Sequence, residues 1–193
     1  MVPGLVDSHV HVTLAPGQYL HDWSQDELDA HLKHHLRAYL AAGVTTVLDC
    51  AALWEDLDRV RGWLEAGEPG PRVLALGQPP ALPDSYGPAV LPDLPTQATP
   101  AEVTAHMAEL DRREVAGVKV LWESGMTKPI WPLPEGEWLA ALQAGAREHE
   151  LPLYVHAMDP EETTEALALV GLEALLNLVA IVIRAKFRRA RQW

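Results

Sequence analysis

Cysteine is almost absent from this chain, because Cys50 is the single one among 193 residues. One thiol excludes a disulfide framework within the chain and fits a reducing compartment. Cys50 lies at the end of an apolar stretch, which favours a small buried residue over a reactive nucleophile. The start, MVPGLVDSHV, lacks the basic segment and long apolar run of a secretion signal. We therefore expect a cytoplasmic protein.

Long hydrophobic runs and positive charge are also scarce. No segment reaches the roughly 20 apolar residues that span a bilayer, so a membrane protein is not expected. The formal net charge of −12 argues against a nucleic-acid partner. With 48% hydrophobic and 22% charged residues, the composition is that of an ordinary soluble globular protein. The length suits one main domain.

Predicted strands and helices alternate along the chain. The clearest helix covers residues 24–43, where Ser24 and Glu27 form a capping box and Gly43 ends the apolar periodicity. Similar periodicity predicts the other helices, and the strands between them are short and rich in β-branched residues. The predicted strands are residues 4–12, 44–51, 72–77, 117–121 and 151–157, and the remaining helices are residues 54–67, 101–115, 135–150 and 159–170.

Single helices between strands favour a parallel sheet with right-handed crossovers, and hence an α/β fold. Residues 172–179 fit either a sixth strand or a continuing helix. The connections at 79–100, which is rich in proline, and 122–134 are long. In α/β barrels, long connections after strands shape the substrate site. A proline-stiffened surface loop without a role is the alternative.

Two histidines, His9 and His11, stand one residue apart within the first predicted strand. Side chains alternate between the faces of a strand, so both share a face with Asp7, whereas Val10 and Val12 belong to an apolar face. Same-face neighbours have Cα atoms roughly 6–7 Å apart, close enough for both imidazoles to reach one ion at about 2.0–2.1 Å. The pair favours a metal site, with hydrogen-bonded buried histidines as the alternative.

Three later strands carry an ionisable residue near their carboxyl ends, namely Asp49, Lys119 and His156. Active sites of α/β barrels are built at this edge of the sheet. A lysine inside a ring of parallel strands is costly unless it has a role. The alternatives are a Lys119 side chain that reaches out of the strand end and a His156 that simply packs in the core.

The segment PGLVDSHVH resembles the first-strand signature of the amidohydrolase superfamily, and AAGVTTVLD resembles the second strand. PRVLALG, GVKVL and LPLYVHA follow in the family's order, so the similarity covers roughly residues 3–177. The set most resembles the subgroup around imidazolonepropionase-like and prolidase-like enzymes. This resemblance implies an incomplete TIM-like (β/α)8 barrel over residues 1–177, with five to six parallel strands but without the last strands and the β-sandwich domain.

The resemblance also implies a metal site. Two histidines of the first strand would bind one divalent ion, and the histidine of the fifth strand would bind a second. The lysine of the fourth strand, carboxylated, would bridge them. The expected cofactor is Zn²⁺, as one or two ions. Asp7 and Asp49 are expected to support the ligands or the structure rather than bind metal. The four implied ligands are His9, His11, Lys119 and His156.

The activity that the resemblance implies is hydrolysis of C–N bonds in a small amide, dipeptide or cyclic amide. A divalent metal lowers the pKa of a bound water toward ~7 and polarises the substrate carbonyl. The expected partner is accordingly a small-molecule amide or peptide substrate.

The chain also departs from the family pattern. Asn177 stands at the sixth-strand ligand position, where an amide is a poorer ligand than imidazole. The strand-eight aspartate has no counterpart, so the catalytic residue is unknown. Residues 178–193, apolar and then basic, match no barrel segment. They fit an aberrant terminus, an amphipathic helix that covers a sheet edge or partner, or a contact with anionic membrane.

An incomplete parallel sheet leaves unpaired edges, so we expect self-association. The alternative function is therefore a non-catalytic, metal-binding or assembly-competent fragment of such a barrel.

Further candidates lie outside these strands. His31, His34 and His35 occupy the helix of residues 24–43 away from its apolar stripe; a solvated face is favoured over an ion shared by His31 and His35. Trp122 and Trp131 are equally suited to lining a substrate pocket and to anchoring loops.

Overall fold

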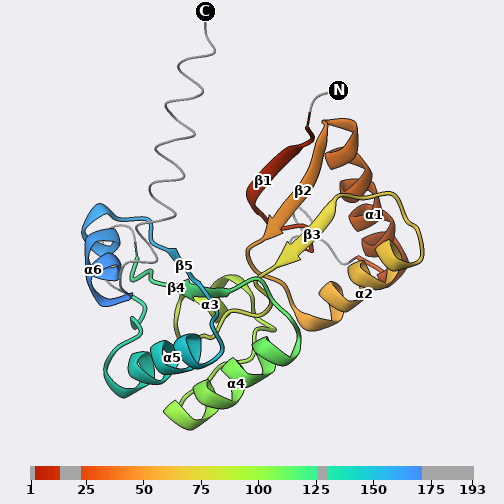
Figure 1. Ribbon diagram of the computed structural model, residues 1–193. Helices are drawn as coiled ribbons and strands as arrows, with labels where there is room; N and C mark the ends of the chain where they lie inside the picture. The colour runs from red at the N-terminus through yellow and green to blue at the C-terminus, as the bar shows by residue number, and fades with distance from the viewer. Residues whose placement is uncertain (1–2, 14–22, 126–129, 171–193) are drawn as a thin grey trace, which may run out of the picture. The chain divides into compact units, whose positions relative to one another are not determined.

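The chain forms two compact units in the computed structural model, which describes residues 3–13, 23–125 and 130–170 (Figure 1). Unit 1 runs to Pro79 and includes residues 114–116, and unit 2 contains residues 80–113 and the chain from Gly117 onward.

Unit 1 is a parallel sheet with helices between its strands (Figure 1). The strand order is β1-β2-β3, and both neighbouring pairs are parallel. The elements are β1 (Leu5–Val10), α1 (Gln25–Ala41), β2 (Val44–Asp49), α2 (Trp54–Glu65) and β3 (Arg72–Ala75).

The ends of α1 follow from its sequence. The Ser24 side chain accepts a hydrogen bond from the Glu27 backbone N–H, and the Glu27 carboxylate accepts the Ser24 N–H at 2.9 Å, which completes the predicted capping box. At the other end Gly43 adopts φ +79°, a conformation that glycine reaches without a steric cost. Between these ends Leu32 and Leu36 are fully buried.

The carboxyl half of β1 packs beneath the helices of unit 1. Val10 and Val12 are buried in a cluster with Leu36 of α1, Val47 of β2 and Val60 of α2. Burying a valine or leucine side chain is worth about 1.5–3 kcal/mol, so this contact fixes which face of β1 is turned inward.

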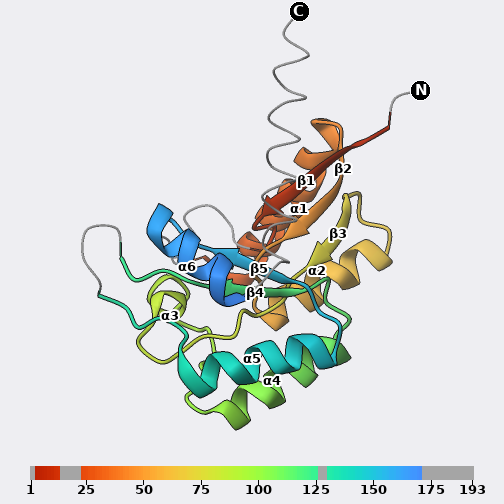
Figure 2. The same cartoon turned by 60° about the vertical axis from the view of Figure 1, so that its left-hand side comes forward.

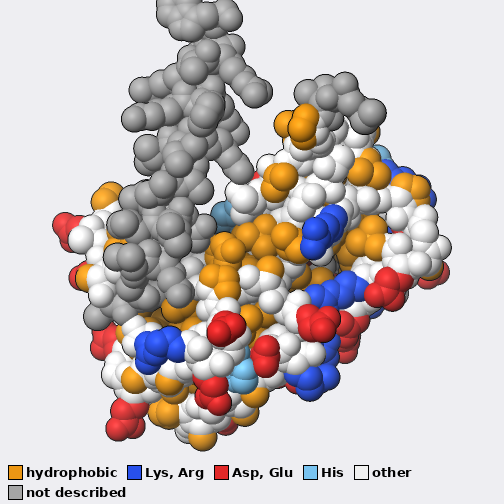
Figure 3. Space-filling model, viewed as in Figure 1, with side chains coloured by type: hydrophobic (Ala, Val, Ile, Leu, Met, Phe, Trp, Pro, Cys, Tyr) orange, Lys and Arg blue, Asp and Glu red, His pale blue; other side chains and the backbone are white. Residues whose placement is uncertain are grey.

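The amino half of β1 differs from the sequence prediction. By strand alternation Val6 falls on the same face as Val10 and Val12, but it is 57% exposed, and Leu5 beside it is 59% exposed. Orange apolar side chains accordingly lie at the surface along β1 in Figure 3. The helices cover only the carboxyl half of this strand, so strand periodicity alone overstated its burial.

The described residues of unit 2 form two parallel strands and four helices. Helices α4 and α5 lie side by side in both views of the ribbon (Figure 2). They approach closely at Gly145, where an added Cβ would lie 2.7 Å from Met107. The elements are α3 (Tyr86–Val90), α4 (Pro100–Arg112), β4 (Val118–Leu121), α5 (Gly136–Glu148), β5 (Leu153–His156) and α6 (Pro160–Val170).

The proline-rich connection at 79–100 is folded against unit 2. It contains α3, which the sequence analysis did not predict. The buried Gln97 side chain accepts the Ala81 N–H at 2.9 Å, and the Trp138 indole N–H donates to the Gln97 carbonyl at 2.7 Å. These bonds tie the connection to α5, so it is not a structureless surface loop.

The alternation of helices with parallel strands confirms the predicted α/β class. Of the helices in the described ranges, none combines the length and the hydropathy needed to cross a bilayer. Residues 172–179, with the candidate Asn177, and the segment 178–193 lie outside the described residues.

Candidate metal-binding site

The first group of candidate residues lies at the carboxyl end of β1. Asp7 pairs with Val47 and Val10 pairs with Asp49, so β1 uses three steps where β2 uses two. Such an extra residue is a β-bulge, which redirects side chains at a strand end. The Asp7 carboxylate accepts the backbone N–H of His9 at 3.2 Å, inside this irregular stretch. Asp7 thus contacts the backbone at His9, and its supporting role toward a metal ligand stays a prediction.

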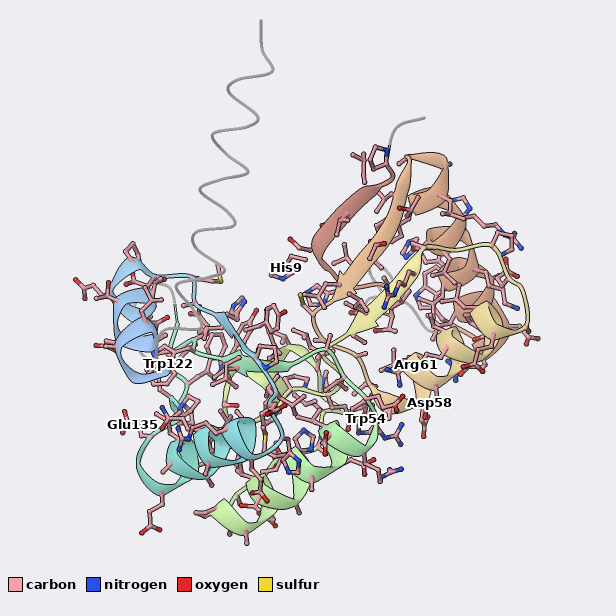
Figure 4. All side chains as sticks on the ribbon, viewed as in Figure 1. His9, Trp54, Asp58, Arg61, Trp122 and Glu135 are labelled. Atoms are coloured by element: carbon pink, nitrogen blue, oxygen red, sulfur yellow. The ribbon has the colours of Figure 1, made fainter. Side chains whose placement is uncertain are left out.

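His9 and His11 lie together on the side of β1 turned away from the helices. Both are exposed, whereas Val10 and Val12 are buried, and the His9 side chain projects away from α1 and α2 (Figure 4). The two ring centroids are 5.6 Å apart and the rings are inclined at 69°. Two imidazoles that share a zinc ion have ring centres at most about 6.5 Å apart, so this pair fits one ion.

Asp49 is the last residue of β2. Its side chain is fully buried and accepts hydrogen bonds from the backbone N–H and the hydroxyl of Thr13. A further bond comes from the Ala51 N–H at 3.4 Å. Burial raises the pKa of the Asp49 carboxyl to about 7, against the lowering effect of these hydrogen bonds. Asp49 thus fixes the segment that follows β1, in keeping with the predicted structural role.

Cys50 is buried as the sequence suggested, with 3% of its surface exposed. Its sulfur lies 3.6 Å from the Leu48 carbonyl and 4.0 Å from the Ser8 carbonyl. A thiol placed this way packs β2 against β1 and is poorly accessible to a substrate.

A second group of candidate residues belongs to unit 2. Lys119 pairs with Tyr154, and Leu121 pairs with His156, so all four side chains share one face of the β4–β5 pair. Lys119 is only 4% exposed. The Trp122 N–H donates to the His156 carbonyl at 2.8 Å and extends the ladder beyond β4. This register matches the predicted placement of Lys119 and His156.

Glu123 is a polar residue of this site that the sequence analysis missed. Its side chain is 2% exposed, and its Oε1 accepts the Gly125 N–H at 2.9 Å. Its Oε2 is buried, has no hydrogen-bond donor among the described residues, and lies 4.0 Å from His156 Nε2. An acid two residues beyond a predicted strand with a candidate ligand was the signal that could have found it.

Aromatic rings surround His156. The Tyr86 ring stacks on the imidazole at 5.0 Å with an interplanar angle of 12°, and Trp131 meets Tyr86 edge-on at 5.3 Å. Burial and the nearby Glu123 raise the pKa of the Tyr86 hydroxyl. Trp131 is half-buried beside this cluster, whereas Trp122 is 1% exposed, so Trp122 is a core residue rather than a pocket wall (Figure 4).

The histidines of α1 form a different arrangement. His34 is exposed, but His31 and His35 are half-buried with ring centroids 4.5 Å apart, and Trp23 packs on His31 at 5.0 Å. Burial, followed by the neighbouring His31 and His34, lowers the pKa of His35. The predicted solvated face therefore holds for His34 alone.

The structure thus brings the candidate residues together in two groups. His9 and His11 adjoin in unit 1, and in unit 2 Lys119 shares a sheet face with His156, which lies beside Glu123. Within the described ranges, no three His, Cys, Asp or Glu side chains are already arranged to hold a metal ion.

Solved structures of hydrolases share this fold. A Xaa-Pro dipeptidase with methionine bound in its active site has a TM-score of 0.69 and 20% identity, over 86% of this chain and 46% of that one. Ochratoxinase from A. niger has a TM-score of 0.69 and 18% identity, over 88% and 46%. Phenylurea hydrolase B has a TM-score of 0.62 and 20% identity, also over 88% and 46%. The chain therefore spans about 46% of the length of these proteins.

The fold is the parallel α/β arrangement shared with these hydrolases. The model of the amidohydrolase family matches residues 1–175, and the chain belongs to that family. No curated protein matches the chain in sequence.

Proposed function

We propose that this chain acts in metal-dependent hydrolysis of C–N bonds in a small amide, dipeptide or cyclic amide. The observation that carries this proposal is the His9–His11 pair, exposed side by side at the end of β1 while Val10 and Val12 anchor the strand. Family membership gives the pair its chemical context.

The proposed cation ligands are the imidazoles of His9 and His11 together with Lys119 and His156. These donors suit Zn²⁺, bound as one or two ions, with Lys119 carboxylated to supply an anionic oxygen. A divalent cation held there would lower the pKa of a water toward ~7 and polarise the substrate carbonyl.

The surrounding residues would support these ligands. Asp7 holds the His9 backbone through its N–H, and Asp49 holds Thr13, two residues beyond His11. Because both contacts act on the backbone, they fix the position of the backbone that carries the imidazoles rather than the reactivity of the imidazoles.

The proposed cellular compartment and the proposed kind of partner follow from composition. The net charge of −12 disfavours nucleic acid, and a single buried thiol suits a reducing cytoplasm. The expected partner is a small amide or peptide substrate.

The test begins with metal binding. The chain is purified, stripped with a chelator, reloaded with Zn²⁺ and analysed for bound metal. We expect His9→Ala or His11→Ala to lower the bound zinc, whereas His34→Ala, an exposed histidine on α1, leaves it unchanged. Equal zinc retention in all three variants would contradict the proposed site.

Turnover is then measured on a panel of N-acyl amino acids and dipeptides. We expect hydrolysis that depends on added metal and is lost in the His11→Ala variant. A chain that binds zinc stoichiometrically yet hydrolyses nothing, in monomeric and oligomeric fractions alike, would argue for the second candidate function.

That second candidate is a non-catalytic, metal-binding or assembly-competent fragment of a (β/α)8 barrel. The observation that favours it is the exposed pair Leu5 and Val6, 59% and 57% accessible on the strand at one end of the described unit 1 sheet. Exposed apolar edge strands are sites of pairing between chains. Sedimentation velocity should show self-association that Val6→Lys weakens; a monomer at high concentration would count against assembly.

A further inference from the structure

We propose that Glu123 and His156 form a chelating pair, in which Glu123 Oε2 and His156 Nε2 bind one divalent cation. The inference rests on the proposed function in using His156 as a ligand, and it adds a carboxylate that the predicted ligand set does not contain.

The burial of Glu123 is the first observation. Its side chain is 2% exposed, and one of its two carboxylate oxygens accepts the Gly125 N–H. The other, Oε2, meets no hydrogen-bond donor within the described part of the chain. A buried carboxylate oxygen is costly unless it has a partner, because both its charge and its lone pairs leave water.

The separation of the two atoms is the second observation. Glu123 Oε2 lies 4.0 Å from His156 Nε2, which is too far for a hydrogen bond. With metal–nitrogen and metal–oxygen distances of about 2.0–2.2 Å, one ion can bridge atoms up to about 4.2 Å apart. A tetrahedral angle at the ion needs about 3.3 Å, so a side-chain movement of roughly 0.7 Å completes the geometry.

The backbone around the pair is fixed by several contacts. The Trp122 N–H binds the His156 carbonyl at 2.8 Å, and Glu123 follows Trp122 directly. The stacked Tyr86 ring holds the plane of the imidazole. The backbone and hydroxyl of Ser124 both donate to the Glu162 carboxylate, which fixes the chain just beyond Glu123. Little backbone entropy is therefore left to lose when a cation binds.

The gap itself favours a cation over a direct ion pair. A protonated histidine bonded to a carboxylate closes to about 2.7–2.9 Å, because the hydrogen bond is charge-assisted. The observed 4.0 Å exceeds that distance and stays within the about 4.2 Å that one ion can bridge. Imidazole nitrogen and carboxylate oxygen are both common Zn²⁺ ligands.

The experiment is a zinc titration of the metal-free chain in competition with a chromophoric chelator. Glu123→Gln keeps the shape of the side chain but removes its charge, and we expect it to weaken zinc binding at least tenfold. Glu137→Gln, at an exposed position of α5, is the matched control and should retain wild-type affinity. Glu123→Asp keeps a carboxylate on a shorter arm and should fall between the two.

A double-mutant cycle separates a shared ion from two unrelated effects. If one ion joins the pair, His156→Ala alone and His156→Ala with Glu123→Gln weaken zinc binding nearly equally. Additive losses would overturn the chelating pair. The Co²⁺-loaded chain gives a second readout, because loss of a carboxylate ligand changes its visible absorption bands.

The outcomes separate this inference from the proposed function. If His9→Ala weakens zinc binding and Glu123→Gln does not, the chelating pair is wrong and the proposed function stands. If Glu123→Gln weakens binding but His9→Ala and His11→Ala do not, the pair stands without the proposed function. Each variant is first checked by circular dichroism. If Glu123→Gln is unfolded without metal, Glu123→Asp replaces it in the titration.

Discussion

The buried carboxylate of Asp49, at the end of β2, accepts hydrogen bonds from both the backbone and the hydroxyl of Thr13, just beyond β1. This contact joins the ends of two adjacent strands close to the His9–His11 pair. Because Asp49 is shielded from water, its protonation state is coupled to folding.

The first prediction concerns the pH dependence of stability. Burial raises the pKa of Asp49 from 3.8 to about 7, so between these values the folded chain holds a proton that the unfolded chain has released. The contribution of Asp49 is therefore fully present below about pH 4 and is lost as pH rises toward 7. Its slope is at most about 1.4 kcal/mol per pH unit.

Urea unfolding of the metal-free chain at several pH values measures this slope. Asp49→Asn should flatten the dependence between pH 5 and 7, since the amide does not titrate there. Asp93→Asn, an exposed carboxylate, should keep the wild-type slope. An unchanged slope in Asp49→Asn would show that this carboxyl does not control the transition.

The second prediction concerns Asp7. Its carboxylate accepts the His9 N–H within the β-bulge, so Asp7→Ala should loosen His9 and weaken zinc binding about tenfold. Asp7→Asn retains an oxygen acceptor and should bind zinc nearly as well as the wild type. Competition titration gives both affinities, and equal weakening by the two variants would point to the charge of Asp7 rather than its hydrogen bond.

The third prediction separates backbone strain from crowding at two glycines with positive φ. Gly77 has φ +69°, and an added Cβ would lie 2.4 Å from the Trp54 ring; Gly43 has φ +79° with nothing within 4 Å. Gly43→Ala should cost about 1–2 kcal/mol from strain alone. Gly77→Ala should cost about 2–4 kcal/mol, because overpacking adds to the strain. Urea midpoints compare them, and equal losses would mean that Trp54 moves aside freely.

Local sequence signals accounted for most of the fold. The capping box of Ser24 and Glu27 was visible as a residue pair, and it forms as predicted because it needs only the first turn of the helix. The short helix α3 was missed, because prolines hide its periodicity and its position depends on packing beyond its own residues.

The candidate site was less accessible to sequence reasoning. The shared face of His9 and His11 was predicted from alternation, and the position of Lys119 and His156 near the carboxyl ends of their strands was visible in the sequence. Glu123 was missed because it lies beyond β4, where alternation no longer applies. Its burial and its distance to His156 arise from contacts between segments far apart in sequence.

The last prediction concerns the ring that holds His156. Tyr86 stacks on the imidazole at 5.0 Å, and such aromatic pairs contribute about 0.5–1.5 kcal/mol beyond their buried area. If stacking holds His156 ready for a cation, Tyr86→Leu should weaken zinc binding about three- to tenfold. Tyr86→Phe keeps the ring and loses only the hydroxyl, so it should bind zinc like the wild type. Loss of affinity in Tyr86→Phe would assign the effect to the hydroxyl, whereas wild-type affinity in Tyr86→Leu would show that the imidazole is held by the β4–β5 backbone alone.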